Sequence, residues 1–253
     1  MGKIIAVANQ KGGVGKTTTA VNLSAWLSIL GCRVLLVDFD PQGNATSGLG
    51  VDKDALDSCI YDLLLGEAQM EQVKIVDLLE RMDLIPASIE LAGAEIEMVG
   101  MVNRERLLKQ VLKQEKEHYD YIIIDCPPSL GLLTINAMVA SDSVMVPLQC
   151  EYYALEGLGQ LMNTIKLVKQ DLNRELELEG VVLTMFDGRV NLAIQVVDEV
   201  KKYFPDQVYQ SIIPRNVRLS EAPSHGKPVM LYDRRSRGAE MYQSLAREVM
   251  GLE

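Results

Sequence analysis

A glycine-rich segment near the start of the chain constrains the fold more than any other feature. It reads Gln10-Lys11-Gly12-Gly13-Val14-Gly15-Lys16-Thr17-Thr18. The apolar residues 4–8 before it have the pattern of a buried β-strand, and residues 17–30 after it have that of a helix. A strand that passes through such a turn into a helix points several backbone N–H groups at one place, where they can bind a phosphate group. The segment therefore predicts a phosphate-binding loop in an α/β fold.

The residue types in this loop indicate what it binds. Lys16 is expected to reach the outer phosphates of a nucleotide, and the hydroxyl of Thr17 to bind Mg²⁺. The predicted cofactors are therefore ATP and Mg²⁺. The alternative is a glycine-rich turn without a ligand, but the strand, the spacing and the helix all match a phosphate loop. The residues expected to surround the nucleotide phosphates are Lys11, Gly12, Gly13, Val14, Gly15, Lys16, Thr17 and Thr18.

The loop departs from the usual pattern at its start. The pattern G-x-x-x-x-G-K-[ST] would place a glycine at residue 10, where this chain has Gln10. Lys11 follows, so a second cation lies close to Lys16. Two neighbouring cations are unfavourable unless highly negative phosphates lie between them. Lys11 therefore favours a densely charged site, and one interpretation is that it reaches phosphates bound by a facing subunit.

Two other apolar segments end in carboxylates. Residues 35–44 end a strand with Asp38 and Asp40, and residues 122–129 end another with Asp125. Ligands bind at the carboxyl ends of strands in parallel sheets. Asp125 is predicted to hold Mg²⁺ directly or through water, and Asp40 to orient or deprotonate the attacking water. Asp38 has two interpretations, hydrogen bonding within the turn or the phosphate loop, and a place in the shell of the metal.

The rest of the chain alternates strand patterns with helical patterns. Strands are predicted at residues 4–8, 34–37, 121–124, 143–146 and 180–184, with a further one at 82–86. Helices are predicted at residues 17–30, 104–116, 155–172, 192–203 and 239–250. This alternation predicts a doubly wound, mostly parallel β-sheet flanked by helices, in a single domain that spans residues 1–253. Residues 51–100 are the least regular and are expected to form an insertion.

Charge is distributed unevenly along the chain. The 25 basic and 35 acidic residues give a net charge of -10, which argues against a nucleic-acid coat or a polybasic membrane binder. The net charge is -11 up to Gly180 but +1 after it, so an anionic partner is expected to dock on the last third of the chain. The sequence has no signal core, no membrane-spanning apolar run and no paired cysteines, which predicts a soluble, cytoplasmic protein.

The motifs together resemble those of the ParA/Soj chromosome-partitioning ATPases. Residues 11–18 (KGGVGKTT) are similar to the deviant Walker A box of that family, and residues 38–44 (DFDPQGN) to its A′ box. Three further segments resemble Soj-type proteins in particular, and the likeness covers the whole chain. They are residues 125–129 (DCPPS), 149–157 (QCEYYALEG) and 213–224 (IPRNVRLSEAPS).

The resemblance implies an ATP-dependent switch in chromosome or plasmid partitioning. ATP would close a homodimer in which Lys11 reaches the partner's phosphates, and the dimer would bind DNA without sequence specificity on the nucleoid. A ParB/Spo0J-like protein would stimulate an otherwise weak ATP hydrolysis and release the dimer, and Soj-type proteins also act on replication initiation. In this scheme Lys11, Lys16 and Asp40 are catalytic, and Pro214 and Asn216 lie near the adenine.

The carboxy-terminal part of the chain carries the predicted DNA surface. Residues 206–238 hold six basic and three acidic residues in an otherwise acidic chain. Contacts to phosphates alone give binding that is independent of sequence and steeply sensitive to salt. The alternative is a solvated face whose arginines pair with Glu221 and Asp233. The predicted DNA contacts are Arg189, Arg215, Arg218 and Lys227.

Two rival functions share the predicted loop and sheet. A MinD-like membrane ATPase would need a basic amphipathic helix at the carboxy terminus, but residues 239–253 hold one arginine and three glutamates. No membrane partner is therefore expected. An ATP-dependent biosynthetic ligase, similar to dethiobiotin synthetase, would instead turn over ATP rapidly only with its small substrate.

Overall fold

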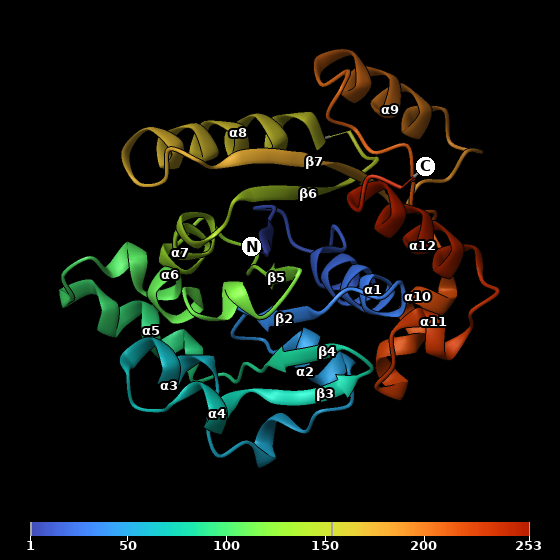
Figure 1. The fold of residues 1–253 in the computed structure, drawn as a ribbon. Coiled ribbons are helices and arrows are strands. Elements are labelled where there is room, and N and C mark those ends of the chain that lie inside the picture. Colours follow the sequence, from blue (N-terminus) through green and yellow to red (C-terminus); the bar gives the residue numbers. More distant parts are fainter. Residues whose placement is uncertain (1, 153, 253) are drawn as a thin grey trace.

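A sheet of seven strands forms the centre of the molecule (Figure 1). The computed structural model describes residues 2–152 and 154–252. The strands lie in the order β3-β4-β2-β5-β1-β6-β7, and neighbours are parallel except for the antiparallel pair β3 and β4. The strands are β1 Lys3–Val7, β2 Val34–Asp38, β3 Ile75–Leu79, β4 Met82–Ile85, β5 Tyr121–Asp125, β6 Ser143–Gln149 and β7 Glu177–Thr184.

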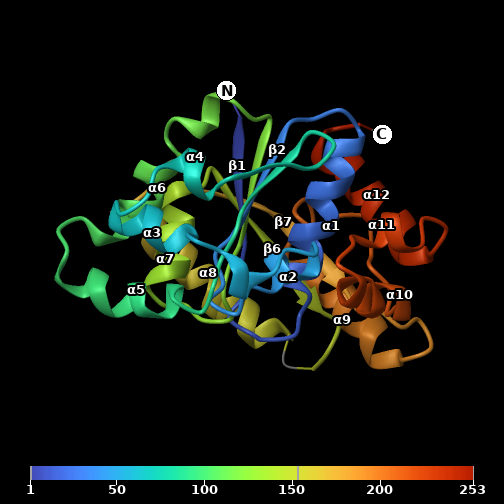
Figure 2. The same ribbon diagram turned by 90° about the horizontal axis from the view of Figure 1, so that it is seen from below.

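Helices cover both faces of the sheet. Figure 2 shows α1, α11 and α12 on one side of the strands and α3, α6 and α7 on the other. The longer helices are α1 Lys16–Ile29, α7 Leu132–Ala140, α8 Ala154–Asp171, α9 Asn191–Tyr203 and α12 Arg237–Val249. The shorter ones are α2 Asn44–Gly48, α3 Ile60–Leu65, α4 Met70–Val73, α5 Leu91–Glu97, α6 Leu107–Leu112, α10 Val217–Glu221 and α11 Val229–Tyr232. Single 3-10 turns are η1 Lys53–Ala55, η2 Met98–Gly100, η3 Arg104–Arg106, η4 Glu115–Glu117 and η5 Ala222–His225.

The two hydrophobic cores follow from the alternation of side chains along each strand. In β1, Ile4 and Ala6 pack into the core that contains α7 and α8, whereas Ile5 and Val7 pack into the core that contains α1 and α12. A strand covered on both faces is apolar throughout, which is why the central strands have continuous hydrophobic sequences. Among the described residues, no helix is both long enough and apolar enough to cross a membrane.

The predicted fold class is confirmed. All six predicted strands are present within one to three residues of the expected bounds, and four of the five predicted helices are present as single helices. Sequence analysis did not predict β3, α7 or the short helices α2, α3, α4, α5, α10 and α11. Nearly every side chain of α7 is buried, so its sequence lacks the amphipathic periodicity by which a surface helix is recognised.

Two predictions about the middle of the chain are wrong. The helix expected at residues 104–116 is divided into η3, α6 and η4, because the chain turns after α6 and brings Glu115 into a largely buried ion pair of 2.7 Å with Lys74. Residues 51–100 are not an insertion. Their strand β4 pairs with β2 inside the sheet and has Leu84 and Ile85 fully buried.

The register of the central strands determines where the site forms. Asp125 at the end of β5 lies opposite Val7 at the end of β1 and opposite Asp38 at the end of β2. The glycine-rich loop follows β1, so the loop and these two carboxylates meet at the carboxyl ends of the central strands. The chain leaves β1 between β5 and β6, at the topological switch point where doubly wound sheets bind ligands.

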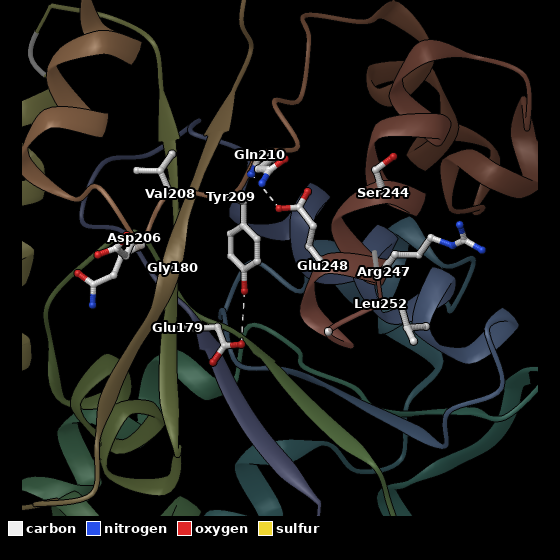
Figure 3. A pocket seen from close by; sticks show the side chains of 12 residues that line it. Glu179, Gly180, Asp206, Val208, Tyr209, Gln210, Ser244, Arg247, Glu248 and Leu252 are labelled. Carbon is white, nitrogen blue, oxygen red and sulfur yellow. Dashed lines mark hydrogen bonds between the residues drawn. The ribbon is translucent and has the colours of Figure 1, made fainter.

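A cleft of about 780 Å³ lies beside the start of β7, at the other end of this strand from the phosphate loop (Figure 3). The ring of Tyr209 lies against Gly180, and its hydroxyl donates a hydrogen bond of 3.4 Å to Glu179. A Cβ atom at residue 180 would lie 2.6 Å from Tyr209 Cε2, and the backbone there has a φ of 155°. This position therefore requires glycine.

We expect Gly180→Ala to lower the free energy of unfolding by about 2–3 kcal/mol, because the methyl group would displace the ring of Tyr209 and the backbone conformation disfavours L side chains. Urea unfolding followed by circular dichroism measures this change. Gly159→Ala is the control, since its Cβ in α8 would meet no atom within 4 Å. An equal loss in both variants would contradict the close approach of Tyr209.

Candidate functional site

The loop between β1 and α1 has the conformation of an anion-binding turn. Gly13 and Gly15 have positive φ angles of 73° and 89°, which favour glycine. Gly15 is also the N-cap residue of α1 and offers no side chain to the helix. The first N–H groups of a helix have no partner within it, so those of α1 face the loop with the positive end of the helix dipole. The loop and helix can together bind the oxygens of a phosphate group.

Two residues outside the predicted set hold this loop in place. Asn9 donates a hydrogen bond of 2.8 Å to the Pro147 carbonyl and accepts one of 3.0 Å from the Lys11 N–H. The hydroxyl of Thr184 donates a hydrogen bond of 2.9 Å to the Val14 carbonyl. Asn9 directly precedes the motif and is a polar side chain at a strand end, which was a usable signal. Thr184 ends β7 and nothing in its local sequence links it to the loop.

Lys16 lies over the loop and is buried. Its ammonium group donates a hydrogen bond of 3.0 Å to the Lys11 carbonyl, and the residue is only 6% exposed. Burial lowers the pKa of Lys16, and the nearby carboxylates of Asp125 and Asp40 act against this shift. The cation is thus already placed among carboxylates beside the helix N-terminus, where the outer phosphates of a nucleotide would lie.

Asp125 is the least satisfied polar group at this end of the central strands. Its side chain is completely buried, and within the described residues neither oxygen has a hydrogen-bond partner. Burial, followed by the charge of Asp38, raises the pKa of Asp125 well above its usual range, although the nearby Thr17 hydroxyl acts in the opposite direction. An unpaired buried carboxylate next to a threonine hydroxyl fits a divalent cation, because Mg²⁺ binds hard oxygen ligands. Asp125 and Thr17 are the residues that would hold it.

The two carboxylates after β2 have different surroundings. Asp38 accepts hydrogen bonds from the Thr46 N–H at 2.8 Å and from the Thr46 hydroxyl at 2.7 Å, which fixes the turn into α2. Burial raises the pKa of Asp38 to about 6. Asp40 accepts one hydrogen bond of 2.9 Å from the Gln42 N–H and is 6% exposed. The contacts of Asp38 match the turn-fixing interpretation of this residue, while Asp40 lies close enough to act on the pKa of Lys16.

A cavity of about 500 Å³ adjoins the loop on the side of α10. Gly15, Thr18 and Thr184 line it from the loop side, and Tyr242 of α12 lines it as well. Pro214 and Asn216, which the family resemblance places near the adenine, line it too. The cavity is mixed apolar and polar and adjoins the phosphate loop, as a nucleobase site requires. The larger cleft beside the start of β7 contains none of the predicted site residues.

Comparison with known proteins agrees with this geometry. A family model described as an AAA domain matches residues 2–178. The chain is 65% identical to the sporulation initiation inhibitor protein Soj of Bacillus subtilis, over 98% of both proteins. The chain belongs to the Soj/ParA family. Its identity to the chromosome partitioning protein ParA of Myxococcus xanthus is 57%, over 99% of this chain and 88% of that protein.

A solved structure extends the comparison of this Soj/ParA protein. A cobyrinic acid a,c-diamide synthase from Mycobacterium smegmatis, solved with bound ADP and magnesium, has a TM-score of 0.87 and 40% sequence identity. The match covers 99% of this chain and 94% of that one. The fold around the phosphate loop is therefore shared with a protein that was crystallised with a nucleotide and a metal.

Lys11 of this Soj/ParA protein points away from its own loop. Its ammonium group forms an ion pair of 3.0 Å with Glu151, and its side chain is 41% exposed. The unusual Gln10 donates a hydrogen bond of 2.8 Å to Gln160 of α8. Both departures from the usual loop pattern thus contact the region that follows β6. Sequence analysis did not single out Glu151 as a partner for Lys11.

Of the four predicted DNA contacts of this Soj/ParA protein, two form surface ion pairs and two line cavities near the phosphate loop. Arg189 and Arg218 are exposed but paired, Arg189 with Asp187 at 2.6 Å and Arg218 with Glu221 at 2.8 Å and Asp233 at 3.2 Å. The surface pairing that the sequence allowed as an alternative is therefore present for Arg218. Arg215 is exposed and lines the cavity of about 500 Å³ that adjoins the phosphate loop. Lys227 lines a small crevice beside Thr17 and Thr18, close to the phosphate loop.

Because the pKa of Asp125 is raised, we expect the stability of the protein without nucleotide or Mg²⁺ to depend on pH. In the unfolded chain an aspartate loses its proton near pH 4 (about 3.9), whereas burial raises the pKa of Asp125 in the folded chain. Between these two pKa values the unfolded state has released a proton that the folded state keeps, so the free energy of unfolding falls as the pH rises. Asp125→Asn removes this titration. We expect the variant to gain stability relative to the unchanged protein as the pH rises through this window.

Urea unfolding at a series of pH values above 4, with EDTA present, measures this difference in the free energy of unfolding. Asp198→Asn, on the exposed side of α9, is the control for the removal of one carboxylate from the surface. A difference for Asp125→Asn that stays constant with pH would contradict a raised pKa for Asp125.

Proposed function

We propose that this protein is an ATP-dependent switch in chromosome or plasmid partitioning, formed by residues 1–253 as one ATPase domain. ATP and Mg²⁺ close a homodimer, the dimer binds DNA without sequence specificity, and hydrolysis stimulated by a ParB/Spo0J-like protein releases it. The observation that carries the proposal is the buried Asp125, which has no hydrogen-bond partner among the described residues and lies beside Lys16 and the N-terminus of α1. This arrangement fits a ligand that combines phosphates with a divalent cation.

The residues of the site divide the reaction between them. The N–H groups at the start of α1 and the ammonium group of Lys16 bind and orient the β- and γ-phosphates. When bound, Mg²⁺ supplies a positive charge that neutralises charge on the phosphate oxygens, and Asp125 and Thr17 hold it. Asp40 orients the attacking water and accepts its proton. Its carboxylate is held for this by the Gln42 N–H.

Lys11 supports the two-subunit form of the site. Its ammonium group is paired with Glu151, outside the loop, and two fifths of the side chain is exposed. A surface ion pair of this kind is weak, so a stronger anion can displace it. The phosphates of a nucleotide bound by a second subunit are such an anion. In the dimer Lys11 would therefore complete the partner's site.

The described part of the chain also bears on the rival functions. The apolar side of α12 is buried against α1, with Tyr242, Leu245 and Ala246 almost inaccessible, so it is not available to a membrane surface. The similarity to a cobyrinic acid a,c-diamide synthase keeps a biosynthetic ligase as the second candidate. Sequence identity is higher with the Soj and ParA proteins, which favours partitioning and a location on the nucleoid in the cytoplasm.

Two substitutions separate nucleotide binding from hydrolysis. We expect Lys16→Ala to abolish ATP binding, because the outer phosphates lose their buried cation. We expect Asp40→Asn to bind ATP and dimerise but to lower turnover by about 100-fold or more, since it cannot accept the proton of the attacking water. Asparagine keeps the oxygen that accepts the Gln42 N–H. Fluorescent-nucleotide titration, sedimentation and phosphate release measure the three properties, and unchanged turnover would remove Asp40 from the mechanism.

The switch itself is tested by measuring ATP hydrolysis and DNA binding together. We expect duplex DNA of random sequence to bind with ATP and not with ADP, and its affinity to fall steeply with salt. Arg218→Glu should weaken this binding while leaving ATP-dependent dimerisation intact. ATP turnover that ignores DNA but requires a small carboxylic acid would favour the ligase. ATP-dependent flotation with liposomes, without DNA binding, would favour the membrane ATPase.

A further inference from the structure

Two arginines of the proposed DNA surface, Arg189 and Arg218, are paired with carboxylates of the same chain. Asp187 accepts three hydrogen bonds from Arg189, from its backbone N–H at 3.1 Å, from Nε at 2.9 Å and from Nη2 at 2.6 Å. These hydrogen bonds lower the pKa of Asp187 to about 2, and the charges of Arg189 and Arg215 add to the shift. Asp187 therefore holds Arg189 directly.

Arg218 is paired with two carboxylates, whereas Arg189 is paired with one. Its Nη1 atom lies 2.8 Å from Glu221 and its Nε atom 3.2 Å from Asp233. The Tyr232 hydroxyl donates a hydrogen bond of 3.1 Å to the same Glu221, and the guanidinium carbon lies 6.0 Å from the centre of the Tyr232 ring. Two carboxylates from different helical segments therefore fix one guanidinium group on the surface.

Two of the predicted DNA contacts are paired with three carboxylates in a single chain. Arg189 pairs with Asp187, and Arg218 pairs with Glu221 and Asp233. A protein gains affinity for DNA when its arginines replace the counterions bound to the phosphates, and an arginine already paired with a carboxylate contributes less to this gain. Each exposed ion pair is weak, so a phosphate can displace the carboxylate. The free energy of the broken ion pair is then subtracted from the free energy of binding.

We propose that Asp187, Glu221 and Asp233 compete with DNA phosphates for Arg189 and Arg218, and so set the affinity of the protein for DNA. The proposal rests on the DNA binding proposed above and identifies residues that limit it.

Asp187→Asn and Asp233→Asn test this directly. Asparagine keeps an oxygen that can accept the N–H of Arg189 or Arg235, so each turn is preserved while the charge is removed. With ATP and a random-sequence duplex, we expect each variant to bind roughly two- to fivefold more tightly, the range expected for release of a surface ion pair. The plot of log affinity against log salt should become steeper by up to about 0.9 for each arginine set free.

The matched control is Asp206→Asn, which changes the net charge by the same amount. Asp206 lines the cleft beside the start of β7 (Figure 3), and neither Arg189 nor Arg218 is among the residues that line it. We expect little change in its DNA affinity. An equal gain in Asp206→Asn would show that net charge alone is responsible and would overturn the proposal. Thermal unfolding and ATP binding, unchanged in all three variants, show that fold and nucleotide site are intact.

Double substitutions show whether each carboxylate acts through its arginine. In a chain that already carries Arg189→Ala, Asp187→Asn should no longer raise the affinity, and Arg218→Ala should likewise remove most of the effect of Asp233→Asn. A full gain in the double variants would contradict competition. If the unchanged protein with ATP binds no DNA at low salt, the proposed function fails. If it binds DNA but Asp187→Asn and Asp233→Asn have no effect, only this inference fails.

Discussion

Asp125 is a buried carboxylate that has no hydrogen-bond partner among the described residues, and it lies where three central strands of the sheet end. Val7 and Asp38 are its register partners in β1 and β2, so the phosphate loop and a second carboxylate are placed beside it by strand pairing. An ionised group in such surroundings is unfavourable unless a cation joins it. Lys16 reaches toward this position from α1, and a metal ion brought with a nucleotide would satisfy the remaining oxygens.

Residues next to Asp125 are linked by hydrogen bonds and shared surfaces to more distant segments of the chain. Asp38 binds Thr46, and the Thr46 hydroxyl accepts a hydrogen bond of 3.0 Å from the Ala87 N–H after β4. On the other side, Val217 and Leu219 of α10 line the cavity beside the phosphate loop, while Arg218 between them lies on the proposed DNA surface. A single short helix therefore borders both.

Prediction from sequence worked where a short segment carries its own signal. The loop, its strand and its helix follow one another directly, so their spacing is visible, and the strands that end in Asp38 and Asp125 are short apolar segments with clear limits. It failed for α7, which is buried on nearly all sides, and for residues 51–100, whose place inside the sheet depends on pairing between β4 and β2. Such pairing joins residues far apart in the chain.

The sequence by itself determined the α/β class, the phosphate loop and the two strand-end carboxylates, because each depends on the order and spacing of neighbouring residues. Only the tertiary structure decided the partners of these groups. It placed Thr184 on the loop, paired Lys11 with Glu151, left Asp125 unpaired and set Asp233 against Arg218. These contacts join residues from distant segments, and their strength depends on burial and on the charges nearby, which exist only when the chain has folded.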